Sequence, residues 1–449
     1  MSQPCIPMSS PDLTAAEIEA VTQVLQTRRL SIGPRIAEFE ERFAAYVGAR
    51  HAVAVSSGTA GLHLCVIAAG VGEGDPSGLR AGALKAEGLD SSELALSAVK
   101  GQSLVITTPF SFVASANVIL YQRAIPIFVD VDERTGNIDP ALVAEAAHKL
   151  TRACPEPVKG RQGGKGRGRQ GGGKTGGQLK AILPVHVFGQ PADMDAINAV
   201  AQEYGLTVIE DACEALGAEY KGRRIGRQPA TCDLRLATCF AFYPNKQMTT
   251  GEGGMIVTDN DDWAALFRSL RNQGRDVHDA WLNHSRLGYN YRLDEMSAAL
   301  GLAQLGRIEE LLAKRERVAQ CYNQRLKDVE GVQIPYIAPT TTRMSWFVYV
   351  IRLAPGINRN AVMAALEERG IPSRPYFTPI HLQPFYRECL GTGEGDFPVT
   401  EAIARSSLAL PFSGVMTEEQ VDYVCEHLRA VLRQWHGRKR NKAPIGVNE

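Results

Sequence analysis

The sequence predicts an α/β protein in which a mostly parallel sheet lies between helices, followed by a smaller C-terminal α/β domain. The first observation is that short β-rich runs alternate with helical stretches up to about residue 260, as a parallel sheet requires. The second is that several of these runs are apolar without alternation, which is typical of strands buried on both sides. The third is the length, because 449 residues exceed one ordinary domain and predict two or three.

Two helices are predicted before the first strand. Thr14 and Glu17 have the spacing of a capping box, which marks the start of the first helix. Three apolar residues then fall on one helical face, namely Ile18, Val21 and Leu25. The second helix has four apolar residues at helical spacing and ends at Gly48; these residues are Ile36, Phe39, Phe43 and Val47.

Seven strands follow in the large domain, which we assign to residues 1–287. Their sequences are HAVAVSS (51–57), LVITT (104–108), IPIFVDV (125–131), AILPVHV (181–187), LTVIED (206–211), LATCFAF (236–242) and MIVTD (255–259). Residues 288–435 are assigned to a linking helix and a smaller domain. In that part we expect helices at 294–326, 360–368 and 417–432 and a strand in WFVYVIRL (346–353), followed by a frayed tail at 436–449.

Two segments interrupt the strand pattern and are interpreted as insertions. Residues 76–102 stand where a short connection would do, and they include a predicted small helix at 91–99. Residues 154–178 are almost wholly Gly, Lys, Arg and Gln, so we expect disorder. Gly168, Gly173, Lys174 and Thr175 satisfy a phosphate-loop pattern there, but no helix follows them, and we do not expect a nucleotide site. Contact of these basic residues with a polyanion is the alternative to a solvated loop.

Composition and charge exclude several classes of protein. No apolar run approaches the roughly 20 residues that span a bilayer, and the N-terminus lacks the features of a secretory signal, so we expect a cytoplasmic protein with no membrane partner. Lys+Arg and Asp+Glu are both 49, which offers no overall field for nucleic acid, and none is expected as a partner. The nine cysteines contain no C-x-x-C pair, and we expect reduced thiols and no metal site.

Polar residues at three strand ends are candidates for a ligand site. Ser57, Gly58 and Thr59 lie between a strand and a helix, where backbone N–H groups can bind a phosphate; a plain helix cap is the alternative. Asp211 closes an apolar strand and should lie at its carboxyl end, where ligands of open α/β sheets bind. A carboxylate there can hold a proton on a ring nitrogen, although many such residues only cap a helix.

Lys246 lies in a loop between two strands, in FAFYPNKQMTTGEGG. Most lysines are solvated surface groups, but lysine also forms Schiff bases with carbonyl cofactors, and this loop can aim the amine at a site shared with Asp211. Phe112 follows another strand and could stack on a flat ring or simply pack in the core. His186 also follows a strand, and we interpret it as a near-core histidine with its hydrogen bonds satisfied.

In this order the segments resemble the DegT family of sugar aminotransferases, which are pyridoxal 5'-phosphate (PLP) enzymes of the aspartate-aminotransferase fold (fold type I). The resemblance runs from about Pro7 to Leu432, apart from the two insertions. Its carriers are SSGTAGLHL, TTPFSFVASANVI, FVDVD, PVHVFGQPADMD, VIEDACEALGAEYKGRRIG, FAFYPNKQMTTGEGGMIVTD and LGYNYRLDEMSAALG.

The resemblance implies roles for the site residues. Lys246 is implied to hold PLP covalently and to be the catalytic acid and base, Asp211 to contact the pyridine nitrogen, and Phe112 to stack on the ring. Ser57, Gly58 and Thr59 are implied to bind the phosphate. Glu214 holds the family position that reaches toward the ring hydroxyl or the phosphate. Asn290 resembles the residue that a neighbouring subunit lends to the phosphate, which implies a homodimer with shared active sites.

One residue departs from the family pattern, and another defines the reaction. Ala241 replaces a serine that often binds the phosphate, which removes a hydrogen bond worth about 1 kcal/mol. Family relatives with His in place of Lys246 are dehydratases, so the lysine implies transamination.

We therefore expect an aminotransferase that moves an amino group from glutamate to a nucleotide-linked keto-sugar. The leading substrate is a 4-keto-6-deoxy hexose on UDP, GDP or dTDP, for polysaccharide or glycoside biosynthesis. Arg292 is a candidate for binding the donor carboxylate or the sugar nucleotide, and Arg374, Tyr376 and His381 lie in a segment that resembles the substrate-side loop. The alternatives are a PLP enzyme that acts on a non-sugar ketone and a non-catalytic ligand-binding protein on the same fold.

Overall fold

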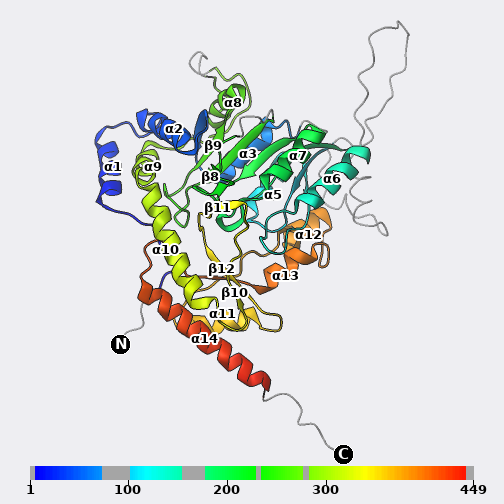
Figure 1. The fold of residues 1–449 in the computed structure, drawn as a ribbon. Helices are drawn as coiled ribbons and strands as arrows, with labels where there is room; N and C mark the ends of the chain where they lie inside the picture. The colour runs from blue at the N-terminus through cyan, green and yellow to red at the C-terminus, as the bar shows by residue number, and fades with distance from the viewer. Residues whose placement is uncertain (1–5, 73–101, 154–176, 229–233, 277–282, 441–449) are drawn as a thin grey trace, which may run out of the picture.

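The structure is a computed structural model that describes residues 6–72, 102–153, 177–228, 234–276 and 283–440 (Figure 1). The predicted helix at 91–99, the expected disorder of the second insertion and the phosphate-loop pattern lie outside these residues. Gln178, which we included in the second insertion, is the first residue of a strand, and its N–H donates to the Gln102 carbonyl at 2.8 Å. In the described residues, no helix is both long and apolar enough to cross a membrane.

A seven-stranded sheet forms the centre of the large domain. Its strands lie in the order β1 (His51–Val55), β9 (Gly254–Thr258), β8 (Leu236–Ala241), β5 (Thr207–Asp211), β4 (Gln178–Leu183), β2 (Ser103–Thr107) and β3 (Ile125–Phe128). Strand β9 is antiparallel to both of its neighbours, and the other adjacent pairs are parallel. The prediction of a largely parallel sheet built from these seven runs is therefore confirmed.

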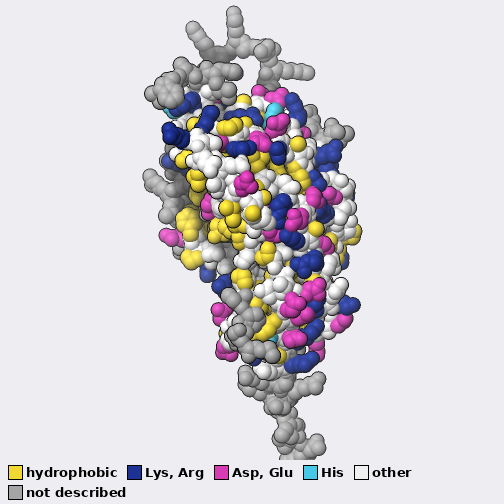
Figure 2. Space-filling model, turned by 90° about the vertical axis from the view of Figure 1, so that its left-hand side faces the viewer, with side chains coloured by type: hydrophobic (Ala, Val, Ile, Leu, Met, Phe, Trp, Pro, Cys, Tyr) yellow, Lys and Arg dark blue, Asp and Glu magenta, His cyan; other side chains and the backbone are white. Residues whose placement is uncertain are grey.

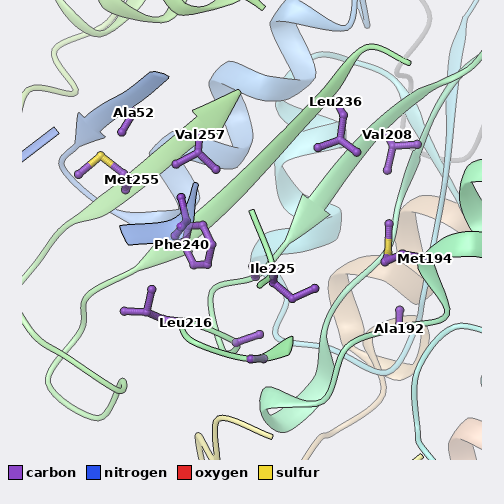
Figure 3. Close-up of a cluster of buried hydrophobic side chains, with 14 of the residues drawn as sticks. Ala52, Ala192, Met194, Val208, Leu216, Ile225, Leu236, Phe240, Met255 and Val257 are labelled. Atoms are coloured by element: carbon purple, nitrogen blue, oxygen red, sulfur yellow. The ribbon is translucent and has the colours of Figure 1, made fainter. Parts of the chain in front are cut away.

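Helices cover both faces of this sheet because its strands are apolar on both sides. One face packs against α2 (Pro34–Val47), α6 (Pro140–Ala153), α7 (Met194–Tyr204) and α9 (Glu295–Gly306). The other packs against α3 (Gly58–Ala68), α5 (Ala114–Tyr121) and α8 (Asp261–Arg271). Alternate residues of one strand enter opposite cores, as Val208 and Ile209 do. Figure 3 shows Phe240, Leu236 and Val257 among the side chains of the first core.

The N-terminal helix α1 (Ala15–Gln26) begins at the predicted capping box, since the Thr14 N–H donates to Glu17 Oε2 at 2.6 Å. The predicted apolar face of this helix is exposed to solvent, whereas a monomeric protein usually buries such a face. Ile18 is 67% exposed and Leu25 is 55% exposed, whereas Glu17 and Val24 are buried against the rest of the chain. Helix α2 ends as predicted at Gly48, which takes the left-handed conformation with φ of 82°.

A second core lies in the C-terminal part of the chain. A three-stranded sheet, in the order β10 (Val332–Gln333), β12 (Tyr349–Leu353) and β13 (Ser407–Leu410), packs with α10 (Ile308–Leu326), α11 (Arg359–Glu367) and α14 (Glu418–Arg440). A third small sheet has the order β11 (Thr341–Arg343), β6 (Glu219–Tyr220) and β7 (Arg223–Arg224). Helices α12 (Pro384–Leu390) and α13 (Pro398–Ser406) return to the large domain, since Tyr386 and Ile403 join cores there.

Two predicted boundaries in this part are wrong. The linking helix at 294–326 is two helices, α9 and α10, because the helical conformation is interrupted at Arg307, with φ of −113° and ψ of 9°. The last helix does not end at residue 432 but continues to Arg440, so the first five residues of the expected tail are helical. The tail sequence is rich in Lys and Arg, which are good helix formers, and this outweighs the lack of apolar residues there.

Candidate active site

The candidate site lies where the parallel strands of the large sheet end. Ser57 is the N-cap of α3, and its Oγ accepts the Ala60 N–H at 3.1 Å. A helix leaves its first N–H groups without partners inside the helix, so they are available to an anion. A Cβ on Gly58 would lie 2.7 Å from the Ala241 Cβ, and one on Gly254 would lie 2.7 Å from the Ser57 carbonyl. Only glycine fits at these two positions, and the close packing holds the start of α3 between β8 and β9.

Asp211 occupies the carboxyl end of β5, as predicted, and it is 5% exposed. Its Oδ2 accepts a hydrogen bond from Ser115 Oγ at 2.7 Å, and its Oδ1 accepts the Cys213 N–H at 3.1 Å. Both oxygens are therefore oriented by fixed donors. A buried, oriented carboxylate can hold a proton on a basic nitrogen that is brought against it.

Lys246 lies in the loop between β8 and β9, and its side chain is 14% exposed. Its N–H donates to the Tyr243 carbonyl at 2.9 Å, and the Thr250 N–H closes the loop onto the Phe242 carbonyl at 2.9 Å. The Nζ lies 3.9 Å from Glu214 Oε1 and 3.9 Å from the centroid of the Phe347 ring. The amine is therefore held close to a carboxylate and under an aromatic ring, away from bulk solvent.

Glu214 interacts electrostatically with both Lys246 and Asp211. Its Oε2 accepts the Phe188 N–H at 2.9 Å, and the side chain is buried. Burial raises the pKa of Glu214 to about 7, the Lys246 amine and the Phe188 N–H act to lower this pKa, and the Asp211 charge adds to the rise. Near neutral pH this group can thus exchange a proton with its surroundings, which an ordinary surface glutamate cannot.

Phe112 and Asn290 are exposed, although the resemblance implies that both contact the cofactor. Phe112 precedes α5 and is 63% exposed, which is unusual for so large an apolar side chain. Asn290 is exposed between Tyr289 and Tyr291. Its backbone is fixed nearby, since the Ser56 N–H donates to the Tyr291 carbonyl at 2.9 Å.

The remaining candidates are two histidines, which are buried, and two arginines. His186 is buried and bonds Glu210 Oε2 and the Ala192 N–H, so the prediction of a satisfied core histidine is confirmed. His381 is also buried and lies 3.2 Å from Glu401 Oε1, and it therefore has a structural partner. Arg292 donates to Asn272 Oδ1 at 3.2 Å. Arg374 is exposed and donates to the Ser373 carbonyl at 2.8 Å.

Aromatic residues from distant segments line the site, and Tyr376 is one of them. The ring of Phe188 is stacked on that of Phe377 at 5.2 Å and lies 6.0 Å from that of Tyr376. Burial raises the pKa of Tyr376 to about 12, and the charge of Glu214 adds to the rise. We call Phe188, Phe347, Tyr376 and Phe377 the aromatic wall.

The residues that sequence reasoning missed are Ser115 and Phe347. Ser115 has a signal in the sequence, because it follows Phe112 by three residues and starts a helix beside the strand end. Phe347 has none, since it reaches Lys246 from a segment 101 positions away in the chain.

The donors present fit the cofactor that the resemblance implies. PLP carries a phosphate, a basic ring nitrogen and an aldehyde, and the site offers open N–H groups at a helix start, an oriented carboxylate and a lysine amine. Phe112 adds an exposed flat ring. Within the described residues, no group of three or more His, Cys, Asp or Glu is placed to hold a metal ion.

Comparisons of the sequence and of the structure with known proteins all identify aminotransferases or proteins of sugar and polysaccharide biosynthesis. A sequence model of the DegT/DnrJ/EryC1/StrS aminotransferase family matches residues 11–76 and 85–429. GDP-perosamine synthase of Caulobacter vibrioides is 36% identical over 433 residues, which are 96% of this chain and 99% of that protein. Spore coat polysaccharide biosynthesis protein SpsC of Bacillus subtilis is 34% identical over 442 residues, or 95% of this chain and 97% of that protein. The crystal structure of DesV from S. venezuelae superposes with a TM-score of 0.75 at 30% identity, covering 95% of this chain and 98% of that one.

Proposed function

The chain belongs to the DegT/DnrJ/EryC1/StrS aminotransferase family, and we propose that it moves an amino group from glutamate to a nucleotide-linked 4-keto-6-deoxy hexose. It is a PLP-dependent aminotransferase of fold type I, and its relatives include enzymes named as sugar aminotransferases. The observation that carries the proposal is the placement of the Lys246 amine 3.9 Å from Glu214, beside the strand end that holds Asp211. Membership in a family of aminotransferases argues against the non-catalytic alternative.

Each residue of the site has a task that its surroundings support. When bound, PLP supplies a protonated pyridine ring that stabilises negative charge on the substrate carbon. Asp211, oriented by Ser115 and Cys213, holds the proton on the ring nitrogen. Ser57, Gly58 and Thr59 would hold the phosphate through backbone N–H groups and the two hydroxyls, and Phe112 would offer an aromatic face to the ring.

Lys246 has the central task, because it is both the covalent anchor and the group that moves the proton. Its Nζ takes the proton from the Cα of the amino donor and returns one to the sugar carbon in the second half of the reaction. The low exposure of the Lys246 side chain keeps bulk water away from the amine, and the Phe347 ring lies over it. Glu214 Oε1 lies 3.9 Å from this amine and interacts with it electrostatically.

The keto-sugar is supported by the relatives and by the aromatic wall. GDP-perosamine synthase is a relative that shares nearly the whole chain, and its name places it in nucleotide-sugar chemistry. The name of the second relative places it in polysaccharide biosynthesis, which is the pathway class we propose for this chain. Aromatic rings such as those of Phe188 and Tyr376 present apolar faces to a sugar ring while the Tyr376 hydroxyl offers a hydrogen bond.

The two half-reactions can be followed in the visible absorbance of purified protein supplied with PLP. We expect a band of the lysine-bound cofactor that is lost on adding glutamate and returns on adding a 4-keto-6-deoxy sugar nucleotide. Lys246→Ala should show no such cycle, whereas Lys221→Ala, a surface lysine paired with Asp195, should behave as wild type. Return of the band with simple keto acids but with no sugar nucleotide would favour the non-sugar alternative.

A second copy of this chain is the proposed partner. The exposed apolar face of α1, with Ile18 and Leu25, continues into Leu30 and Ile32, which are also exposed. Figure 2 looks onto this side and shows hydrophobic side chains gathered between charged ones. Burying such a face is the usual reason for its existence. Exposed Asn290 is proposed to enter the partner's site, as the family resemblance implies.

Mixing two inactive variants tests the shared site. In a hybrid of Lys246→Ala and Asn290→Ala subunits, one of the two sites has both residues intact only if Asn290 acts across the interface. We therefore expect activity to return after the two proteins are unfolded together and refolded. If Asn290 serves its own subunit, both sites of the hybrid carry a defect and the mixture stays inactive.

A further inference from the structure

Arg315 on α10 is a buried cation that the reaction described above does not use. Its side chain is 3% exposed. Within the described residues, the four hydrogen bonds of its guanidinium all end on backbone carbonyls. Burial lowers the pKa of Arg315 to about 10, so the group is still a cation at neutral pH. Burying a charge costs free energy unless polar groups of the protein stabilise it. Here the four carbonyl groups stabilise the guanidinium charge.

The four carbonyls belong to two segments that are far apart in the sequence. Nη2 donates to the carbonyls of Asn245 and Lys246, in the lysine loop. Nη1 donates to the carbonyls of Trp346 and Phe347, at 3.2 Å in both cases. The first pair lies in the large domain, and the second leads into β12 of the smaller sheet. Arg315 therefore fastens the lysine loop to the other side of the site.

The same two segments meet again at the reactive amine. The Phe347 ring centroid lies 3.9 Å from Lys246 Nζ, so Arg315 holds the backbones of both residues in this contact. A parallel connection runs through Gln247, whose Nε2 donates to the Glu214 carbonyl and to Ser345 Oγ at 2.9 Å. Arg315 and Gln247 thus form a frame of hydrogen bonds that holds the lysine loop against residues 345–347 and sets the direction of the amine.

We propose that Arg315 is a positioning residue for transamination, which fixes the lysine loop and the 346–347 segment in one arrangement so that the Lys246 amine meets the donor Cα. This proposal rests on the proposed role of Lys246. The planar guanidinium has five N–H donors in a fixed fork, and it can bond two carbonyls on each side. A lysine has three donors on one atom and cannot span both pairs. Arg315→Lys therefore keeps the charge and removes the frame.

The test compares Arg315→Lys with Arg317→Lys in the PLP-loaded enzyme. Arg317 lies on the same helix and donates to the Met416 carbonyl at 3.0 Å, away from the lysine loop, and it is the matched control. Loss of the visible band on mixing with glutamate gives the single-turnover rate, and its concentration dependence gives the donor affinity. We expect Arg315→Lys to slow the maximal rate at least about tenfold while the donor affinity changes less than about twofold. Arg315→Lys should also slow the growth of the band when PLP is added to the cofactor-free protein. Arg317→Lys should match wild type in the single-turnover rate and in the rate of PLP loading.

Equal maximal rates for Arg315→Lys and wild type would overturn the proposal, even if the variant melted at a lower temperature. Absence of the glutamate-dependent change in wild type would instead overturn the role of the lysine site itself. If Arg315→Lys does not fold, hydrogen exchange of the loaded wild-type enzyme decides the question. The frame requires that residues 243–250 and 345–348 open together, and opening rates that differ by more than about tenfold would contradict it.

Discussion

The ends of the large sheet and the aromatic wall meet at Lys246, but they are built in different ways. Ser57 and Lys246 follow strands and Asp211 ends one, and the sheet brings these positions together because the three strands end at the same edge. Phe188, Phe347 and Tyr376 come from three segments that are far apart in the sequence, and tertiary packing alone assembles them. The sheet edge provides charged and polar groups for one cofactor, whereas the wall provides apolar surface that can vary with the substrate.

This difference separates the chemistry from its selectivity. Changes at the sheet edge should affect the rate with every substrate, because they alter the cofactor site. Changes in the aromatic wall should affect the arrangement of substrate and amine while the cofactor still binds. Four substitutions test this division.

Asp211→Asn should have the largest effect. Asparagine keeps the shape but cannot favour the protonated pyridine ring, and we expect kcat to fall by about 10³-fold, or about 4 kcal/mol. Steady-state kinetics on the PLP-loaded variant measures this fall, and circular dichroism checks the fold. Asp193→Asn, at the N-cap of α7 outside the site, is the control. If kcat falls by less than tenfold, the Asp211 carboxylate has only a structural role at the end of β5.

Glu214→Gln should change how stability depends on pH. The folded-state pKa of about 7 lies above the ordinary value of 4.5, so the folded protein retains a proton that the unfolded chain releases between these values. The contribution of Glu214 is therefore fully present below pH 4.5 and is lost as pH rises through 7, by on the order of 3 kcal/mol.

Urea unfolding of the cofactor-free protein at pH 5 and pH 8 measures this loss. Wild type should lose more stability than Glu214→Gln over this range, because glutamine does not titrate. Glu219→Gln, on β6, should retain the wild-type slope. If the unfolding free energies of wild type and Glu214→Gln change equally with pH, the pKa of Glu214 is not raised in the folded protein.

Phe347→Leu tests the aromatic wall. The substitution removes the ring over the Lys246 amine, and we expect single-turnover rates to fall about tenfold, or about 1.4 kcal/mol. The affinity for PLP, measured from the visible band, should stay within about twofold of wild type, since the sheet edge is intact. Phe397→Leu, which packs on His381 instead, is the matched control. If Phe347→Leu lowers the affinity for PLP and leaves the single-turnover rate unchanged, the aromatic wall serves cofactor binding and not the arrangement of substrate and amine.

Ser115→Ala should have the smallest effect. It removes the hydroxyl that donates to Asp211 Oδ2, which is worth about 1 kcal/mol or roughly a fivefold fall in kcat. Ser111→Ala is the matched control, because Ser111 bonds Ser115 Oγ but does not reach Asp211. If both variants keep the wild-type kcat, the Cys213 N–H alone orients the carboxylate.

The sequence predicts the sheet edge well because strand, turn and helix follow one another within a few residues there. The apolar runs identify all seven strands, and the end of β5 identifies Asp211. It cannot predict the contact of Phe347 with Lys246 or the carbonyls around Arg315, because these depend on how segments far apart in the sequence pack together. The same limit explains α1, whose apolar face was identified in the sequence although its direction, toward solvent, was not.

Borohydride reduction of the PLP-loaded protein, followed by trypsin digestion and mass spectrometry, tests the central assignment most directly. Reduction fixes the covalent attachment, and trypsin then fails to cut at the modified lysine. We expect the reduced cofactor on a peptide that spans residues 236–268, with Lys246 uncut inside it. Cofactor on another lysine, or on no peptide, would contradict the assignment of Lys246 as the residue that holds PLP.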